Sequence, residues 1–350
     1  MSTPREVALA EYPDFPFIDP DELPEIESLM RRLNYLEPGE NITGIAKAGE
    51  GNMNLVLRVS TDRRSVILKQ ARPWVERYDM IAAPWGRIIS ERRFYERIQS
   101  SETLAEQTPE LLGHDDASRT MLLEDLGAAS DLSCVYGDDT VTDDELSAAA
   151  RFLRELHDYT AGERSPEFEN PDMRALNHTH IYDVPLTDHG MFDLDELEPG
   201  LSETAAEVRS DRAFVKKVHD VGRDYLNYPG DATVLLHGDY FPGSLVRTER
   251  GMRVIDPEFC FAGPRCFDVA TMTAHLILAD AADQAAVFLV EYDTRNVNMS
   301  YMSRCVGCEV MRRLIGVAQL PIPKTDGRRA DLLTRARDAV MTDDLQPLLA

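Results

Sequence analysis

Three carboxylates follow two short apolar stretches in the second half of the chain. Asp239 comes directly after TVLLHG, and Asp256 and Glu258 come directly after GMRVI. A carboxylate at the end of a strand has little freedom, so Asp239 can face a substrate hydroxyl and accept its proton. Hard oxygen ligands such as Asp256 and Glu258 suit Mg²⁺, which bridges the phosphate oxygens of ATP. This order and spacing predict phosphoryl transfer with Asp239 as the base.

A glycine-containing turn and a lysine earlier in the chain fit the same chemistry. The turn GEGNMN separates two predicted strands, and its backbone amides could approach the phosphates of ATP, although a plain hairpin turn has the same pattern. Lys69 lies toward the end of the apolar stretch SVILKQ, where an ammonium can neutralise phosphates, and Glu91 on the following helix is its predicted partner. The alternative is that both side chains are solvated. Nucleotide contacts are expected at Gly49, Gly51, Asn52, Asn54, Lys69 and Glu91.

The predicted secondary structure changes near residue 125. ITGIAKAGEGNMNLVLRVSTDRRSVILKQA is typical of three strands joined by turns, RIISERRFYERIQS of a helix, and TPELLGHDDASRTMLLEDL of two further strands. Long helices dominate after LEDLGAASDL. We therefore expect an α+β fold with a small antiparallel-sheet N-terminal lobe over 26–125 and a larger, mostly helical C-terminal lobe over 126–350. Residues 1–25, rich in Pro and acids, are expected to form a loose arm that is partly draped over the fold.

The net charge of the chain disfavours some classes of binding partner. With 62 acidic and 37 basic residues among 350, the net charge is −25. Such a surface repels nucleic acid and anionic membranes, although one basic pocket with a bound metal can still hold a nucleotide. No apolar run is long enough to span a membrane and the first residues do not read as a secretory signal, so a cytoplasmic location is expected. Only five lysines occur, which suits either a salty habitat or GC-rich coding.

Paired cysteines and histidines elsewhere do not indicate a second site. Cys305 and Cys308 form the only CxxC, and without a second pair they are expected to be reduced thiols on a helix. His178 and His180 stand in a polar stretch and are expected to face solvent.

Several of these motifs resemble a known family. HGDYFPGSLV followed by VIDPEFCFAGPRCFDVA resembles the aminoglycoside phosphotransferase and choline kinase superfamily and, within it, the methylthioribose kinases. EGNMNLVLRV and SVILKQARPWV resemble that family's glycine loop and lysine strand, and EVMRRLIG over 309–316 resembles its late E-x-x-RR-x-x-G helix. The resemblance runs from about residue 25 to about residue 325 and implies a bilobal, protein-kinase-like fold that uses ATP and Mg²⁺.

The resemblance also implies roles for individual residues. It makes Asp239 the catalytic base, and it places Arg312 and Arg313 near the sugar and the transferred phosphate. Two guanidinium groups can stabilise the charge that develops there, whereas without the resemblance the pair would be interpreted as a solvated helix face. The remaining implied roles are phosphate binding by Lys69, adenine contacts along the linker Glu124-Asp125-Leu126, and metal binding by Asp256 and Glu258.

Three positions depart from the family or stay open. Ser244 stands where the wider superfamily places a metal-binding Asn, and because a hydroxyl is a weaker ligand, Glu258 is expected to carry more of the coordination. The loop reads Tyr240-Phe241-Pro242, close to the acceptor hydroxyl, where the family usually has a Leu-His-Thr type sequence. Trp74 or Trp85 either closes over the acceptor, as the family's mobile loop does, or serves as a hydrophobic anchor.

The function expected from the sequence is an ATP-dependent kinase that phosphorylates a sugar hydroxyl, with S-methyl-5-thioribose in methionine salvage as the leading acceptor. The alternative is a kinase of the same fold that acts on another small hydroxylated acceptor, although the arginine pair disfavours a cationic one. A catalytically silent nucleotide-binding module is disfavoured because Lys69, Asp239 and Asp256 are all present. A metal-dependent hydrolase would leave the glycine turn and Lys69 without a purpose. A homodimer is compatible with the sequence.

Overall fold

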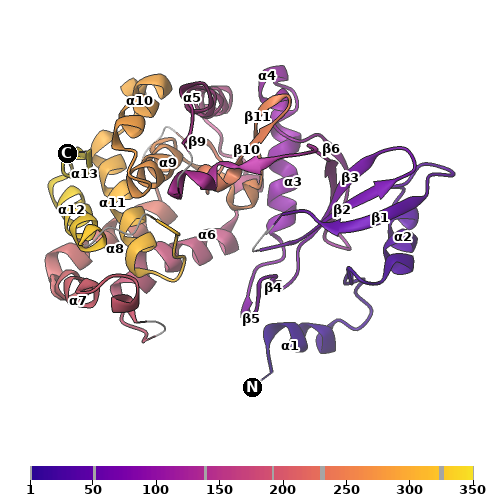
Figure 1. Ribbon diagram of the computed structural model, residues 1–350, viewed down its shortest axis with the longest axis horizontal. Coiled ribbons are helices and arrows are strands. Elements are labelled where there is room, and N and C mark those ends of the chain that lie inside the picture. Colours follow the sequence, from indigo (N-terminus) through magenta and orange to yellow (C-terminus); the bar gives the residue numbers. More distant parts are fainter. Residues whose placement is uncertain are drawn as a thin grey trace. The chain divides into compact units, whose positions relative to one another are not determined.

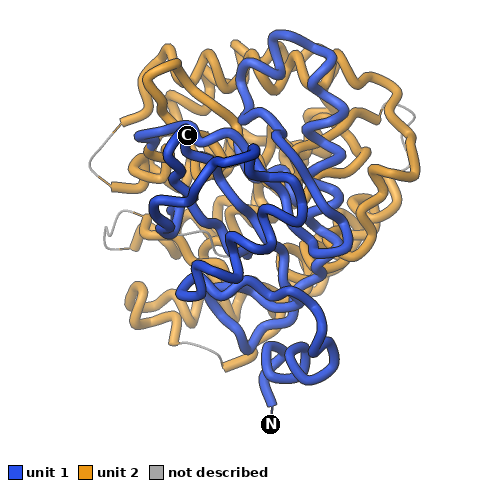
Figure 2. Tube along the Cα trace, turned by 90° about the vertical axis from the view of Figure 1, so that its right-hand side faces the viewer, with its two compact units in different colours: residues 1–129, 255–258 blue, residues 130–254, 259–350 orange. Residues whose placement is uncertain are grey.

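The computed structural model describes residues 2–49, 53–137, 140–190, 193–228, 233–322 and 327–349. The chain divides into two compact units (Figure 2). Unit 1 contains residues 1–129 and 255–258, and unit 2 contains residues 130–254 and 259–350. The sequence suggested a boundary at residue 125 and assigned 255–258 to the second lobe, whereas the structure groups this short segment with unit 1.

Unit 1 is built on an antiparallel sheet with the strand order β1-β2-β3-β7-β6 (Figure 1). Alternation along β2 turns Leu55, Leu57 and Val59 into a buried core that also includes Ile26 and Leu29 of α2. The elements are α2 (Leu23–Arg32), β1 (Ile42–Lys47), β2 (Leu55–Thr61), β3 (Ser65–Gln70), β4 (Trp74–Val75), β5 (Tyr78–Ala82), α3 (Arg87–Ile98), α4 (Glu102–Glu106), β6 (Leu111–Asp115) and β7 (Thr120–Glu124).

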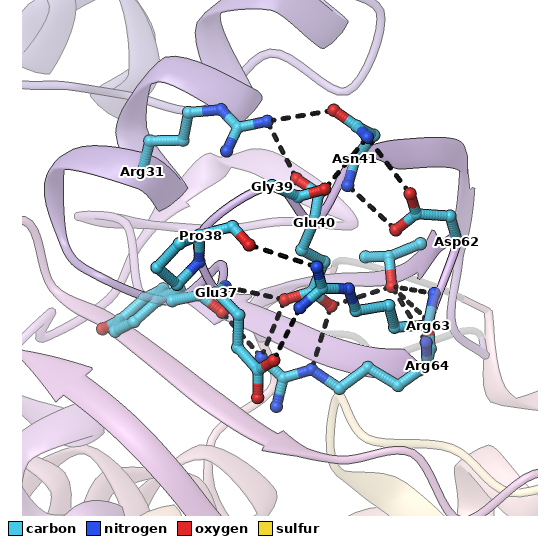
Figure 3. A network of polar contacts seen from close by, with 11 residues as sticks. Arg31, Glu37, Pro38, Gly39, Glu40, Asn41, Asp62, Arg63 and Arg64 are labelled. Atoms are coloured by element: carbon cyan, nitrogen blue, oxygen red, sulfur yellow. Dashed lines mark hydrogen bonds and ion pairs between the residues drawn. The ribbon is translucent and has the colours of Figure 1, made fainter.

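A polar network fixes the start of β1 against the β2–β3 turn (Figure 3). Glu40 is fully buried and accepts hydrogen bonds from Arg64 Nε at 3.0 Å and from the Thr61 hydroxyl at 2.8 Å. Burial alone would raise the pKa of Glu40, but the bonds from Arg64, the Glu37 backbone and Thr61 outweigh it and lower that pKa to about 2. Asp62 in the same turn accepts from the Asn41 backbone at 3.0 Å. The network therefore depends on an ionised Glu40.

The first 25 residues contain a short helix and contact unit 1. Helix α1 (Pro4–Glu11) begins with a capping box between Thr3 and Glu6. Farther along, Ile18 is buried, and its backbone N–H donates to Gln70 of β3 at 2.9 Å. These contacts hold the arm on unit 1.

Unit 2 is mostly helical. Helix α9 (Cys266–Leu278) is buried along its whole length, and α11 (Met299–Ile315) packs against both α9 and α12 (Arg328–Thr342). The other helices are α5 (Asp143–Tyr159), α6 (Pro171–His178), α7 (Leu201–Ser210), α8 (Arg212–Leu226), α10 (Ala282–Tyr292) and α13 (Gln346–Leu349). Two small antiparallel sheets complete the unit. One pairs β9 (Thr233–Leu236) with β12 (Phe261–Pro264), and the other joins β8 (Ser130–Asp131), β10 (Leu245–Thr248) and β11 (Gly251–Val254).

These elements confirm the predicted α+β class, with an antiparallel sheet in the first unit and mainly helices in the second. Among the described residues, no helix is long and apolar enough to cross a membrane.

Candidate functional site

Three of the predicted site residues meet in unit 1. Lys69, near the end of β3, places its Nζ atom 2.8 Å from Glu91 Oε1 and 2.6 Å from Asp256 Oδ1. Lys69 and Glu91 are buried, whereas about half of the Asp256 side chain (51%) is exposed. Burial works to lower the pKa of Lys69, but the carboxylates of Asp256 and Glu91 outweigh it and raise that pKa. Lys69 therefore carries its charge in a pocket of carboxylates.

Asp256 has an unusual backbone conformation. Its φ of +61° lies in the left-handed region, which few residues other than glycine adopt. Aspartate tolerates this region better than most residues, and Asp280 and Asp293 adopt it too, so the conformation alone does not mark a site. The ion pair with Lys69 holds the Asp256 side chain in place.

Glu258 is buried and held by two side chains of unit 1. Asn54 Nδ2 donates to Glu258 Oε2 at 2.6 Å, and Arg87 Nε lies 3.4 Å from the same oxygen. Asn54 Oδ1 in turn accepts from Arg87 Nε at 2.8 Å. Because both ends of the Asn54 amide are engaged, its side chain orients Glu258 in this structure. Asn54 could contact a nucleotide, as expected, only through its backbone, or through its side chain once the bonds to Glu258 and Arg87 are broken.

Arg87 was missed by the sequence reasoning. It is fully buried in the first turn of α3 and also donates to the carbonyls of Met53 and Arg72 at 2.7 and 2.9 Å. A signal was available, because Arg87 and Glu91 are four residues apart and so share one face of a helix. Arg87 thus connects the glycine turn, the region after β3 and the Glu258 carboxylate.

The remaining predicted nucleotide contacts lie in the glycine turn and the linker. Gly49 has a φ of +74° and open space where a side chain would be, whereas Gly51 and Asn52 lie outside the described residues. Glu124 ends β7, and Leu126 is half-buried two residues later.

Between Glu124 and Leu126, Asp125 fixes the linker to the sheet. Its carboxylate accepts from Arg58 Nε of β2 at 2.8 Å and from the Gly127 backbone at 3.0 Å. Arg58 also donates to the Gly127 carbonyl at 2.9 Å. Burial would raise the pKa of Asp125, but the hydrogen bonds from Arg58 and the Gly127 backbone help to lower it, so the pair stays ionic.

Asp239 lies in unit 2, in a loop that leads out of β9. Asp268 of α9 is fully buried and accepts from the backbone N–H groups of His237 and Gly238 at 2.7 and 2.9 Å. Gly238 has a φ of +85°, and a Cβ atom there would stand 2.1 Å from the Phe259 carbonyl oxygen. Only glycine fits this position. Asp268, which sequence reasoning did not single out, therefore fixes the turn that presents Asp239.

The Asp239 carboxylate is partly exposed (23%) and lies near a cation. Arg313 Nη2 of α11 stands 3.8 Å from Asp239 Oδ1. Burial raises the pKa of Asp239, and the charges of Arg313 and Arg312 partly oppose this. Ser244 is buried and donates its hydroxyl to the Asp239 carbonyl at 2.8 Å. In this structure the Ser244 hydroxyl closes the loop.

Arg312 and Arg313 are held by Glu309, one turn earlier on α11. Arg313 Nε donates to Glu309 Oε1 at 2.7 Å, and Arg312 Nη1 donates to Oε2 at 3.0 Å. Their side chains are only 11% and 8% exposed, so the pair is not a solvated helix face.

The two aromatic residues of the loop turn to different neighbours. Tyr240 is fully buried, donates to the Ala149 carbonyl at 2.9 Å and stacks on Phe152 of α5. The Tyr240 ring therefore completes the core against α5. The Phe241 ring lies over Gly243, where a Cβ would approach it to 2.5 Å.

Both tryptophans pack against the N-terminal arm. Trp85 lies 5.1 Å from the Tyr12 ring and 5.0 Å from the Phe15 ring, measured between centroids. Trp74 is buried and lies 5.3 Å from Phe17. These contacts favour the hydrophobic-anchor interpretation for both.

The cysteine and histidine pairs form no further site in the described part of the chain. Cys305 and Cys308 are buried on α11. His178 is only 18% exposed, not solvent-facing as expected, because Gly222 of α8 leaves room for its ring. Within the described ranges, no three His, Cys, Asp or Glu side chains gather as they would around a metal ion.

Comparisons with known sequences agree with the motifs. The family model described as "Phosphotransferase enzyme family" matches residues 44–300. A methylthioribose kinase from Bacillus cereus (strain ZK / E33L) is 28% identical over 257 residues, which cover 70% of this chain and 62% of that kinase. One from Bacillus thuringiensis (strain Al Hakam) is 27% identical over 261 residues with the same coverage. The matched region thus spans 62% of the length of these curated relatives, and the resemblance is confirmed.

Solved structures share the fold at low identity. LicA in complex with AMP has a TM-score of 0.53 at 13% identity and covers 92% of this chain and 99% of that chain. The choline kinase LicA from Streptococcus pneumoniae has a TM-score of 0.50 at 12% identity, covering 91% and 99%. A spectinomycin phosphotransferase in complex with ADP and spectinomycin has a TM-score of 0.51 at 13% identity, covering 93% and 99%. The predicted bilobal, protein-kinase-like fold is confirmed.

Proposed function

The chain belongs to the phosphotransferase enzyme family, and from that premise we propose that it is an ATP-dependent kinase that phosphorylates a hydroxyl of a small molecule. The observation that carries the proposal is Lys69, whose ammonium is buried between Glu91 at 2.8 Å and Asp256 at 2.6 Å. An ammonium anchored on one side by a buried carboxylate is suited to bind phosphate oxygens on the other.

On this proposal, Lys69 binds the α- and β-phosphates while Glu91 keeps the ammonium in place. The phosphate oxygens would take the position beside Lys69 that Asp256 Oδ1 now occupies. Gly49, Gly51 and Asn52 would offer backbone amides to the phosphates, and the linker backbone at 124–126 would meet adenine.

Mg²⁺ fits the carboxylates of this group. Asp256 is half-exposed with one oxygen turned to Lys69, while Glu258 is buried and bonded to Asn54. Since Mg²⁺ is commonly bound through one or two carboxylates plus substrate phosphates, Asp256 would be the main protein ligand and Glu258 the second. Ser244 is the weaker candidate because its hydroxyl already donates to the Asp239 carbonyl. The metal would neutralise the charge on the phosphate oxygens.

Asp239 would act on the acceptor. It accepts the hydroxyl proton while the acceptor oxygen bonds to the γ-phosphorus and the bond to the β–γ bridging oxygen breaks, which releases ADP. The partial exposure of Asp239 leaves its carboxylate accessible, and the loop bonds to Asp268 hold its backbone. Arg313 and Arg312 would stabilise the charge on the moving phosphoryl group.

S-methyl-5-thioribose is the acceptor that we propose, with phosphorylation at the anomeric hydroxyl. Support comes from the curated relatives, which are methylthioribose kinases. It also comes from Arg312 and Arg313, whose charge favours a neutral or anionic acceptor over a polycation such as an aminoglycoside. A different small hydroxylated acceptor on the same machinery is the second candidate.

The test is ADP release from ATP and Mg²⁺ with a panel of methylthioribose, other pentoses, choline and an aminoglycoside. We expect methylthioribose to give the highest kcat/KM. Asp239→Asn should lower kcat by about 10³-fold or more with an unchanged Tm, because general-base catalysis contributes roughly 10²–10⁴-fold. The matched control is Asp283→Asn, at an exposed position of α10. Full activity of Asp239→Asn would refute the base, and no response to methylthioribose would refute the substrate.

A further inference from the structure

A chain of buried hydrogen bonds continues inside unit 2 from the arginine pair of α11. Glu309 Oε1 lies 3.2 Å from His275 Nε2 of α9, and His275 Nδ1 is hydrogen-bonded to the Tyr136 hydroxyl. Tyr136 ends the short 3-10 turn Leu132–Tyr136. Tyr136, His275 and Glu309 are 2%, 0% and 4% exposed, so water does not screen these contacts.

The protonation state of each of these hydrogen-bonded groups follows from the residues around it. The charges of Arg312 and Arg313 and the bond from His275 hold the pKa of Glu309 well below its usual range, although burial works against them. An ionised carboxylate only accepts, so His275 Nε2 must carry the proton that faces it. Burial, and then the charge of Arg313, lower the pKa of His275 to about 4, so the ring is neutral. His275 Nδ1 is therefore an acceptor, and the Tyr136 hydroxyl must donate to it.

With this order of donors, His275 and Arg313 both donate to Oε1, and Arg312 donates to Oε2, of the Glu309 carboxylate. Its Oε1 atom takes Arg313 Nε at 2.7 Å, and its Oε2 atom takes Arg312 Nη1 at 3.0 Å. With Nε engaged, the Arg313 guanidinium turns Nη2 toward Asp239, 3.8 Å away. A planar guanidinium bound at one edge has a defined direction at the other.

The apolar ring of Phe241 packs against His275 and Arg313. Its ring centroid lies 5.0 Å from the His275 ring, and the Arg313 Cζ atom lies 5.5 Å from the Phe241 centroid. The Phe241 ring therefore contacts both the histidine and the arginine, and it limits the directions in which either can move. Glycine at 243 makes this placement available, since any Cβ there would collide with the ring.

We propose that Tyr136, His275 and Glu309 are positioning residues, a relay from the Tyr136 hydroxyl to the arginine pair that holds Arg313 toward Asp239. The proposal rests on the proposed kinase function, because it assigns the relay to the acceptor and phosphoryl group that Arg312 and Arg313 would meet. The rival is a buried polar cluster that only stabilises the packing of α9 on α11.

Tyr136→Phe distinguishes the positioning role from a purely structural one, because it deletes one hydroxyl and keeps the ring. Without that donor, the histidine can adopt the other tautomer, and Nε2 then no longer donates to Glu309. We expect kcat/KM for the acceptor to fall about tenfold or more, since small misplacements of catalytic groups cost up to about 10²-fold, while KM for ATP stays unchanged.

The matched control is Tyr35→Phe, which deletes a buried hydroxyl in unit 1 that lies 3.1 Å from Thr120 Oγ1. It should lower the Tm similarly and leave the kinetic constants within twofold of the wild type. A second pair tests rescue. His275→Gln can still donate to Glu309 and accept from Tyr136, whereas His275→Leu can do neither, so the Gln variant should retain several-fold more kcat per folded molecule.

Histidine side-chain ¹⁵N NMR on the whole protein gives a readout that needs no turnover. His275 should show a neutral ring protonated at Nε2 from pH 8 down to about 5, and Tyr136→Phe should change its Nδ1 shift or its tautomer. If no acceptor releases ADP, the kinase proposal fails while the NMR result still decides the relay. A charged ring or an Nδ1–H tautomer in the wild type overturns the relay, as does an active protein in which Tyr136→Phe behaves like Tyr35→Phe.

Discussion

At the residue scale, two carboxylates keep Lys69 charged, and the phosphates of a nucleotide would bind the same ammonium. Lys69 is almost fully buried, and Glu91 is wholly so. A buried ion pair contributes little compared with apolar residues of the same volume, but removing one partner leaves the other charged and unpaired. Replacing Lys69 alone should therefore cost more stability than replacing both Lys69 and Glu91.

Lys69→Met should lower the free energy of unfolding by roughly 1–3 kcal/mol, because burial raises the pKa of Glu91 to about 8 and the variant leaves this buried carboxyl without the hydrogen bond from Lys69. The double variant Lys69→Met with Glu91→Gln should recover at least half of that loss and remain inactive. Urea unfolding and ADP release measure the two properties. Equal stability of the single variant and the wild type would contradict the role of the pair in folding, and an active double variant would contradict the role of Lys69 in catalysis.

Residues differ in how far the sequence reveals them. Asp239, Asp256 and Lys69 stand at the ends of apolar strands, a local pattern that suggests a function without knowledge of contacts. Arg87 and Asp268 do not, because an arginine in a helix start and an aspartate within an apolar helix acquire meaning only from partners far along the chain. Asn54 was placed in the right turn, but its bond to Glu258 could not be foreseen from either stretch.

At the element scale, the buried helix α9 and the loop after β9 are joined through one carboxylate. Asp268 offers Oδ2 to the His237 backbone and Oδ1 to the Gly238 backbone, so both oxygens are used. His157 of α5 supports it, with Nε2 at 3.4 Å from Oδ2. An amide cannot replace this carboxylate, because its NH₂ group would face a backbone N–H.

Asp268→Asn should therefore destabilise the protein by about 2 kcal/mol and reduce kcat by at least about tenfold, since a buried donor loses its acceptor and the loop that carries Asp239 relaxes. Thr273→Val on the same helix is the control. Its hydroxyl bonds only to the Val269 carbonyl of its own helix turn among the described residues, and its loss should leave kcat unchanged. Wild-type kcat in Asp268→Asn would show that the loop does not need this anchor.

The network around Glu40 predicts a pH dependence. Its pKa is lowered to about 2 in the folded protein, so its contribution is present above the ordinary carboxyl value near 4.5 and is lost as the pH falls toward 2. Glu40→Gln should cost on the order of 2 kcal/mol at pH 7, and the difference from the wild type should shrink below pH 4.5. Denaturant unfolding at pH 7, 5 and 3.5 measures it. Glu37→Gln, exposed in the same network, is the control, and a difference independent of pH would argue against an ionised Glu40.

The order of strands and helices was largely predictable, because alternation and helical spacing are local. The contacts of the arm were not. Its composition predicts a loose segment partly draped over the fold, but it does not indicate that Phe15 and Phe17 pack on the tryptophans or that Ile18 is buried. A few apolar residues in a polar stretch determine whether it docks, and composition averages them away.

At the scale of the whole molecule, chain order and compact units do not coincide. Residues 255–258 follow β11 of unit 2 but belong to unit 1, where Lys69, Arg87 and Asn54 hold the two carboxylates of the segment. Sequence alone assigns a segment to its neighbours along the chain. The contacts that join these four residues to unit 1 come from residues far along the chain.

The net charge of −25 leads to a prediction about salt. If each of the 37 basic residues balanced one of the 62 acidic residues, 25 carboxylates would still have no cation, and their mutual repulsion favours the expanded chain. Raising NaCl shortens the Debye length from about 30 Å at 0.01 M to about 8 Å at 0.15 M, which screens this repulsion. We expect the Tm at pH 7.5 to rise over this range, and calorimetry measures it.

The same titration near pH 5 separates repulsion from general salt effects. There the protein is close to its isoelectric point of about 4.7, so the net charge and the gain from salt should both be small. Ion pairs such as Arg58 with Asp125 are screened as well, which works in the opposite direction. A Tm at pH 7.5 that falls with salt would therefore mean that these pairs outweigh the excess of 25 negative charges, whereas a rise confined to the higher pH would identify repulsion between carboxylates as the larger effect.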